Sequence, residues 1–116
     1  VILGSVNDPT FGPSMMFGLG GIFVEVLKDV TFRVAPVADT QALQMLDEIR
    51  GAPILAGVRG EEQRDKEALA DVICRYSTMI IDLKDEIAES DANPVLVYQR
   101  GNGVKVVDAR IILKKQ

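Results

Sequence analysis

The sequence predicts an α+β fold in which two helices pack on one face of a largely antiparallel sheet. Three observations support this prediction. Apolar runs of strand length fill the first third of the chain, two amphipathic segments follow, and an Asn-Gly hairpin signal lies between apolar runs near the end. Strands, then helices, then a hairpin is an order typical of an antiparallel sheet covered on one side.

The first part of the chain contains four candidate strands. Segments rich in Gly or Pro separate the first three of them, and Gly18–Gly21 is too rich in Gly for regular structure. The candidates are Val1–Val6, Ser14–Phe17, Ile22–Leu27 and Thr31–Val37.

Two of these candidate strands each contain one charged residue, Glu25 or Arg33. Either side chain could lie on a solvent face, and a cross-strand ion pair between them is an equally open interpretation. The Gly18–Gly21 stretch that precedes Glu25 could let backbone N–H groups approach a phosphate, although tight turns often contain such Gly clusters.

Apolar residues at helical spacing predict two helices. The first has Asp39 or Thr40 as its cap and ends before Gly51, and the second extends from about Asp65 to Leu83. Their inner faces are Ala42, Met45, Leu46 and Ile49 in the first, and Leu69, Val72, Ile73, Tyr76 and Ile80 in the second.

Composition limits the function. The 116 residues carry a net charge of −4 with scattered Lys and Arg, so we expect neither a nucleic-acid partner nor a membrane partner. The single Cys74 excludes an internal disulfide and predicts a cytoplasmic protein. The chain has no His, so it cannot itself supply a His nucleophile, a His-ligated zinc or a phosphohistidine.

The chain opens on the strand-like Val1–Val6 without a Met. We therefore expect residues 1–116 to form a single domain that is a fragment of a longer protein. A cut strand exposes apolar surface, so a homodimer formed through Val1–Val6 is a further expectation.

The predicted hairpin brings polar residues together at one end. If its loop has an even number of residues, either two or four, Asn93 and Asp108 fall on the same side of the sheet, with Asp91 and Arg110 beyond them. Carboxylate and amide oxygens beside a guanidinium suit Mg²⁺ and the phosphates that it carries. An ordinary Asp–Arg salt bridge and an Asn-Pro turn would give the same pattern.

The stretches "DPTFGPSMMFGLGGIFVEVLKDVTFRVAPV", "GVRG" and "DANPVLVY…VVDARIIL" resemble the ATP-grasp domain of the NDP-forming acyl-CoA synthetases, which are relatives of succinyl-CoA synthetase. The resemblance covers essentially the whole chain and matches the carboxy-terminal subdomain. It implies the reaction acyl-CoA + ADP + phosphate ⇌ acid + CoA + ATP, through an acyl phosphate and a phosphohistidine.

The resemblance also implies cofactors, site residues and partners. Mg²⁺ and ATP or ADP are the expected cofactors, and Asn93 and Asp108 match the metal ligands. Other domains of the synthetase or a CoA-binding subunit are the expected partners. The remaining matches lie near the transferred phosphate: Glu25, Arg33 and Arg110 as catalytic residues, and Gly20, Gly21, Arg59 and Asp91 as nucleotide contacts.

Two alternatives stay open beside the ligase. One is a non-catalytic, synthetase-like regulatory region of a protein acetyltransferase, and the other is a plain interaction domain. We expect the chain alone to be inactive, because the resemblance leaves out the first ATP-grasp subdomain and the CoA-binding domains.

Overall fold

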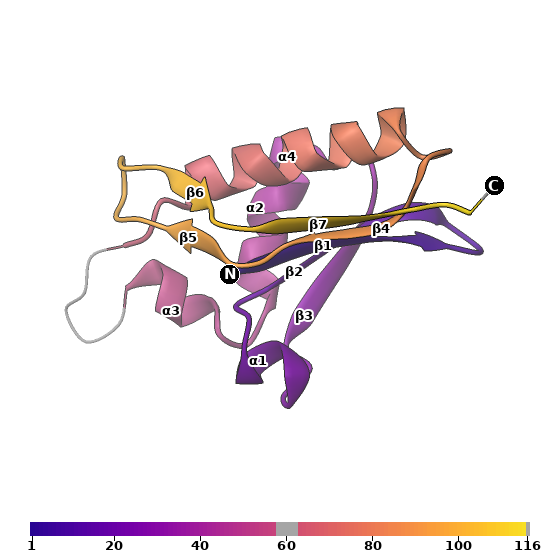
Figure 1. The fold of residues 1–116 in the computed structure, drawn as a ribbon. Helices are drawn as coiled ribbons and strands as arrows, with labels where there is room; N and C mark the ends of the chain where they lie inside the picture. The colour runs from indigo at the N-terminus through magenta and orange to yellow at the C-terminus, as the bar shows by residue number, and fades with distance from the viewer. Residues whose placement is uncertain (58–62, 116) are drawn as a thin grey trace.

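The structure, a computed structural model, describes residues 1–57 and 63–115. A five-stranded antiparallel sheet carries two helices, α2 (Asp39–Glu48) and α4 (Lys66–Asp82), on one face, which confirms the predicted α+β class (Figure 1). The strand order is β3-β2-β1-β4-β7. These strands are β1 (Ile2–Asp8), β2 (Gly12–Gly18), β3 (Val30–Val34), β4 (Ile87–Ala92) and β7 (Ala109–Leu113).

Three smaller elements extend this layer at one end. The short helices are α1 (Ile22–Glu25) and α3 (Ala52–Ala56), and the hairpin consists of β5 (Val95–Val97) and β6 (Val104–Val106). Figure 1 shows α1 and α3 on one side of this end and the hairpin on the other. None of the helices in the described residues is long and apolar enough to cross a membrane.

The core lies between the sheet and the helix pair. Alternate residues of the central strands, among them Leu3, Met15 and Phe17, are fully buried against α2 and α4. Burying a side chain of this size contributes about 1.5–3 kcal/mol. The helices contribute the predicted faces, in which Ala42, Met45, Leu46, Leu69 and Ile73 are fully buried.

Asp65 joins the start of α4 to the hairpin. One carboxylate oxygen accepts the Ala68 N–H at 3.2 Å as an N-cap, and the other accepts the Gly103 N–H at 2.7 Å. These bonds, that from Gly103 above all, hold the pKa of Asp65 below its usual range. The carboxylate therefore fixes where the hairpin turn sits against the helix.

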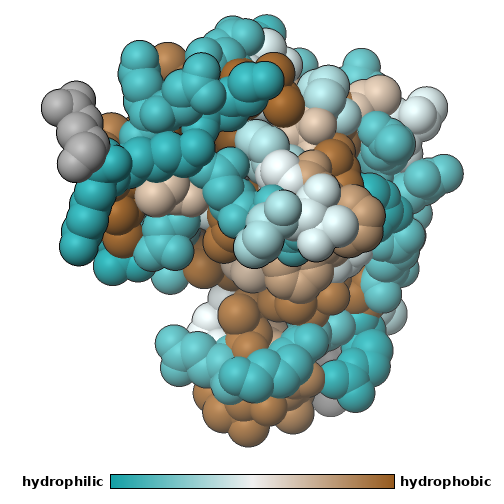
Figure 2. Space-filling model, turned by 90° about the vertical axis from the view of Figure 1, so that its right-hand side faces the viewer, coloured by the Kyte–Doolittle hydropathy of each residue, from teal (hydrophilic) through white to brown (hydrophobic). Residues whose placement is uncertain are grey.

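One predicted strand is wrong. Ile22–Leu27 does not form a strand, because Ile22–Glu25 is the helix α1 and the chain turns at Lys28, which has φ +55°. Ile22, Val26 and Leu27 are 49–69% exposed, and Figure 2 shows apolar residues gathered at this lower end of the molecule. Strand composition did not decide the structure, because these side chains have no neighbouring strand to pack against.

β1 lies at the centre of the sheet, with β2 on one side and β4 on the other. Val1–Val6 therefore offers no free strand edge for the homodimer expected from the sequence. Among the described strands of this sheet, the edges are β3 and β7. All five residues of β7 are exposed, including Ile111 at 49% and Leu113 at 66%.

Candidate functional site

Asn93 and Asp108 lie directly opposite each other where β4 and β7 pass into the hairpin. The Asn93 N–H donates to the Asp108 carbonyl oxygen at 3.0 Å. One register extends through both pairs of strands, from Glu89 opposite Ile112 to Val97 opposite Val104. The even register that the sequence argument required is confirmed.

The turn of the hairpin has four residues, which is one of the two predicted lengths. The Tyr98 N–H donates to the Gly103 carbonyl at 3.0 Å, so these two residues still pair. The chain reverses over residues 99–102, where the Asn102 N–H donates to the Gln99 carbonyl at 2.9 Å. An even loop keeps Asn93 and Asp108 on the same face.

That face is the open side of the sheet. Ser90 and Ala92 on β4 are 7% and 2% exposed and point toward the helices. By strand alternation, Asp91 and Asn93 therefore point away from the helices. Polar oxygens thus line the face that no helix of the described residues covers.

Arg110 stands opposite Asp91 on the neighbouring strand, and its guanidinium lies 3.2 Å from the Asp91 carboxylate. The Arg110 side chain is 68% exposed, so the pair adds little stability. A guanidinium has five N–H donors, and the bond to Asp91 leaves the others available to an anion. The salt bridge considered from the sequence is therefore present, and it leaves Arg110 able to bind phosphate.

The donor set fits Mg²⁺. Within residues 1–57 and 63–115, no three His, Cys, Asp or Glu side chains cluster as a metal site. Mg²⁺ does not require such a cluster, because it takes one or two protein oxygens and completes its shell with phosphate and water. The Asp108 carboxylate and the Asn93 amide would provide these two oxygens.

The predicted glycines and Glu25 lie beyond the end of β2. Gly20 and Gly21 have φ of +97° and +54°, a conformation that favours glycine, and a Cβ at either would meet nothing within 4 Å. Glu25 is the exposed last residue of α1 and does not pair with Arg33. The backbone at the two glycines is therefore open to a ligand.

Arg33 is not brought together with Asn93 and Asp108. It stands opposite the buried Met15 and so points to the helix-covered face, where it forms an ion pair with Glu48 of α2. Glu48 also accepts the Thr31 hydroxyl at 2.6 Å. The bond from Arg33, with that from Thr31, lowers the pKa of Glu48. The predicted residue Arg59 lies outside the described residues.

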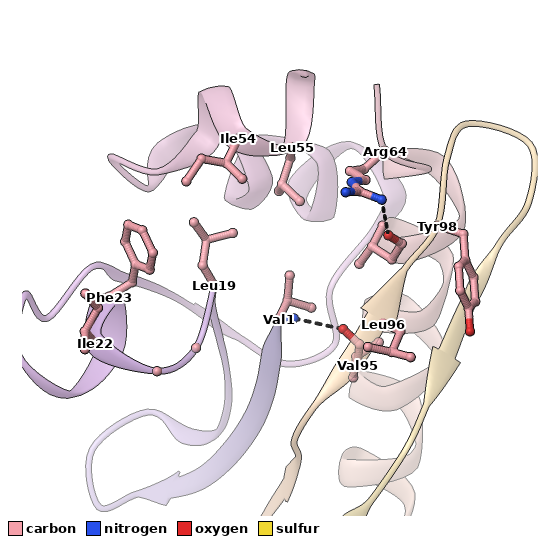
Figure 3. A pocket seen from close by; sticks show the side chains of 13 residues that line it. Val1, Leu19, Ile22, Phe23, Ile54, Leu55, Arg64, Val95, Leu96 and Tyr98 are labelled. Atoms are coloured by element: carbon pink, nitrogen blue, oxygen red, sulfur yellow. Dashed lines mark hydrogen bonds between the residues drawn. The ribbon is translucent and has the colours of Figure 1, made fainter. Parts of the chain in front are cut away.

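A cavity of about 670 Å³ opens between α1, α3 and the hairpin (Figure 3). Leu19 and Phe23 line it from one side, Ile54 from α3, and Leu96 and Tyr98 from the hairpin. Gly20 and Gly21 also line it. Sequence reasoning missed this cavity, because its walls come from five separate stretches of the chain.

Sequence reasoning also missed three hydroxyls beneath Asp91. Ser90 Oγ lies 2.5 Å from Ser5 Oγ and 2.6 Å from the Tyr76 hydroxyl. Burial raises the pKa of the Tyr76 phenol. One sequence feature could have indicated that Ser90 is buried. Ser90 lies between two acids, Glu89 and Asp91, and in a strand it points to the opposite face from both of them, toward the core.

Similar proteins point to one family. Residues 1–113 match the family described as "ATP-grasp domain". The chain is 58% identical over 114 residues to the beta subunit of the ADP-forming acetate–CoA ligase II of Pyrococcus furiosus, covering 98% of this chain and 48% of that protein. It is 50% identical to the ADP-forming 4-hydroxybutyrate–CoA ligase of Nitrosopumilus maritimus, covering 96% of this chain and 16% of that protein.

Solved structures agree with these relatives. The dinucleotide-forming acetyl-CoA synthetase 1 of Candidatus Korarchaeum cryptofilum, in complex with CoA and Mg-AMPPCP, aligns with a TM-score of 0.90 and 48% identity. The alignment covers 97% of this chain and 52% of that one. The chain thus spans about half the length of the beta subunits and a smaller share of the single-chain ligases. The chain belongs to the ATP-grasp domain family, as its resemblance to the NDP-forming acyl-CoA synthetases implies.

Proposed function

We propose that this chain is the Mg²⁺- and nucleotide-binding half of an ADP-forming acyl-CoA ligase. The observation that carries the proposal is the pairing of Asn93 with Asp108 on the open face, beside the Asp91–Arg110 pair. The two relatives described above are ligases named for acetate and 4-hydroxybutyrate, and on that basis we propose a small carboxylic acid as the substrate.

Each residue has a role in this proposal. Asn93 and Asp108 would hold Mg²⁺ through their side-chain oxygens, and the bound ion would supply positive charge beside the transferred phosphoryl group. Arg110 donates N–H groups to a phosphate oxygen, and Asp91 keeps its guanidinium turned toward the same face. These contacts position the phosphate and neutralise its charge.

The proposal requires the rest of the protein. The chain has no His, so any phosphohistidine must come from another part of the ligase. The open face also needs a second wall to enclose a nucleotide. We therefore expect the 116-residue chain alone to have no turnover, and the full-length protein is the object to test.

The first experiment measures ATP formation by the full-length protein from acetyl-CoA, ADP, phosphate and Mg²⁺. Asp108→Asn should lower kcat/KM by more than about a hundredfold, because even partners that only orient a metal ligand are worth 10–100-fold. Asp85→Asn, a change at an exposed acid just before β4 and so at the other end of that strand from Asn93, serves as the control.

Each result has a clear meaning. ATP formation that Asp108→Asn leaves intact would show that the metal lies elsewhere. A protein that binds Mg-nucleotide but forms no ATP with any acyl-CoA would support the regulatory region instead.

A further inference from the structure

Gly4 is a glycine that neither its backbone nor its packing requires. Six other glycines of the described residues have positive φ. At Gly18 a Cβ would lie 2.7 Å from Val24 Cγ2, and at Gly51 it would collide with Leu19. At Gly4, by contrast, φ is not positive, and a Cβ would meet Met16 Cε and the Ser90 carbonyl at 3.4 Å, an ordinary contact.

A glycine at position 4 is unfavourable for the stability of the fold. It occupies the middle of β1, the central strand of the sheet, and pairs with Met16 on one side and Asp91 on the other. Glycine weakens a strand interior, because it loses more conformational freedom on folding than any other residue. A glycine in such a place often marks the close approach of a ligand.

A hollow of about 300 Å³ lies over Gly4 on the open face. Met16 and Phe32 line one side of it, and Asp91 and Arg110 line the other. These five residues form one row across the sheet, because Phe32 pairs with Met16 and Arg110 with Asp91. A side chain at Gly4 would enter this hollow from its floor.

The hollow borders the proposed metal site. On β4, Asn93 follows Asp91 by two residues, so the two side chains are neighbours on the same face. Arg110 and Asn93 are diagonal neighbours across the two strands, and such residues lie about 7–8 Å apart. A phosphate bound to Mg²⁺ on Asn93 could therefore also reach Arg110. Glu89 also lines the hollow and repels an anion, so a phosphoryl group would enter together with its Mg²⁺.

We propose that Gly4 forms the floor of the phosphate site, and that its missing side chain leaves room for a phosphoryl group held between Arg110 and Mg²⁺ on Asn93 and Asp108. The ligand class is the phosphate end of a Mg-nucleotide. This inference rests on the proposed function, and it assigns the floor of the phosphate site to a residue that offers no side-chain contact.

The test compares Gly4→Ala and Gly4→Val in the full-length protein with Val34→Ile. Val34→Ile adds a methylene on the same face of the sheet, at a residue that does not line the hollow. The measurements are the Kd of Mg-AMPPCP, the kcat/KM of ATP formation and the Tm. Because glycine is unfavourable here, Gly4→Ala should keep or raise the Tm while it weakens binding.

Gly4→Val should raise the Kd roughly tenfold, the effect expected of extra methylenes forced into a filled space. It should lower kcat/KM about a hundredfold, as a displacement of about 1 Å does. Val34→Ile should match the wild type in every measurement.

Two results would overturn the role of Gly4. The first is that Gly4→Ala and Gly4→Val bind and react like the wild type. The second is that both variants lose activity and also have a lower Tm. If the wild-type protein itself neither binds Mg-AMPPCP nor forms ATP, the proposed function is wrong. A failure of the function can thus be told apart from a failure at Gly4.

Discussion

The hydroxyl of Tyr76 on α4 lies 2.6 Å from that of Ser90 on β4, directly behind the strand that carries Asp91. Tyr76→Phe removes this bond and leaves Ser90 paired with Ser5. We expect the free energy of unfolding to fall by about 0.5–1.5 kcal/mol. Urea denaturation measures the change. Tyr98→Phe, at a more exposed ring, is the control and should have little effect.

The same phenol predicts a loss of stability in alkali. Burial raises the pKa of Tyr76 in the folded protein, so the folded state holds its proton at a pH where the unfolded state has released it. Stability from this group is complete below the unfolded pKa of about 10 and falls as the pH rises through the folded pKa. A Tm series from pH 8 to 11 should show a steeper decline for wild type than for Tyr76→Phe. Parallel curves would contradict this assignment.

Asp65 predicts a loss of stability in acid. Its folded pKa is lowered by the N–H groups of Gly103 and Ala68, so its contribution is complete above the unfolded pKa of about 3.9 and falls as the pH drops through the folded pKa. Asp65→Asn should flatten the acid limb of a Tm series from pH 7 to 2. It should also speed hydrogen exchange at the Gly103 amide, and unchanged exchange there would exclude the proposed anchor. Asp71→Asn, on the exposed side of α4, is the control.

Arg33 should matter for stability rather than for phosphate. Its guanidinium binds Glu48 on the helix-covered face, so Arg33→Met should lower the free energy of unfolding by no more than about 1 kcal/mol. The kcat/KM of the full-length protein should then stay near the wild-type value, whereas Arg110→Met should lower it strongly. A large loss of kcat/KM at Arg33 with an unchanged Tm would instead restore the catalytic role that the family resemblance implies.

Gly18 should behave in the opposite way to Gly4. A Cβ there would lie 2.7 Å from Val24 Cγ2 and 3.2 Å from the Asp29 carbonyl oxygen, so the turn into α1 would have to shift. We expect Gly18→Ala to lower the free energy of unfolding by about 1–3 kcal/mol. The comparison is made by measuring the Tm of Gly18→Ala and of Gly4→Ala by thermal unfolding. Equal Tm values would show that neither site is constrained by packing.

The sequence predicted the hairpin well, because its signals are local. An even loop and strand alternation are enough to place Asn93 and Asp108 on the same face, and the observed turn over residues 99–102 sets them directly opposite each other. The helix faces of α2 and α4 were predictable for the same reason. Their apolar residues repeat at a helical period and are buried as expected.

Tertiary contacts determine the features that the sequence did not predict, namely β4, α1 and the partner of Arg33. β4 was not predicted as a strand of its own, because its buried positions include Ser90 and Ala92 and the hydrophobic alternation is weak. α1 has a strand composition but follows two glycines in positive φ. The partner of Arg33 is Glu48, which lies on a helix that closes over β3, and no periodicity within the strand could indicate it.

The central place of β1 also has a consequence for how the chain folds. Leu3 pairs with Ala92, so the sheet joins the first residues of the chain to some of the last. Contacts so distant in sequence form slowly, because a long loop must close before they stabilise anything. During synthesis, β1 and β2 emerge long before β4 and β7. The open face with Asn93 and Asp108 is therefore completed only after β7 has left the ribosome.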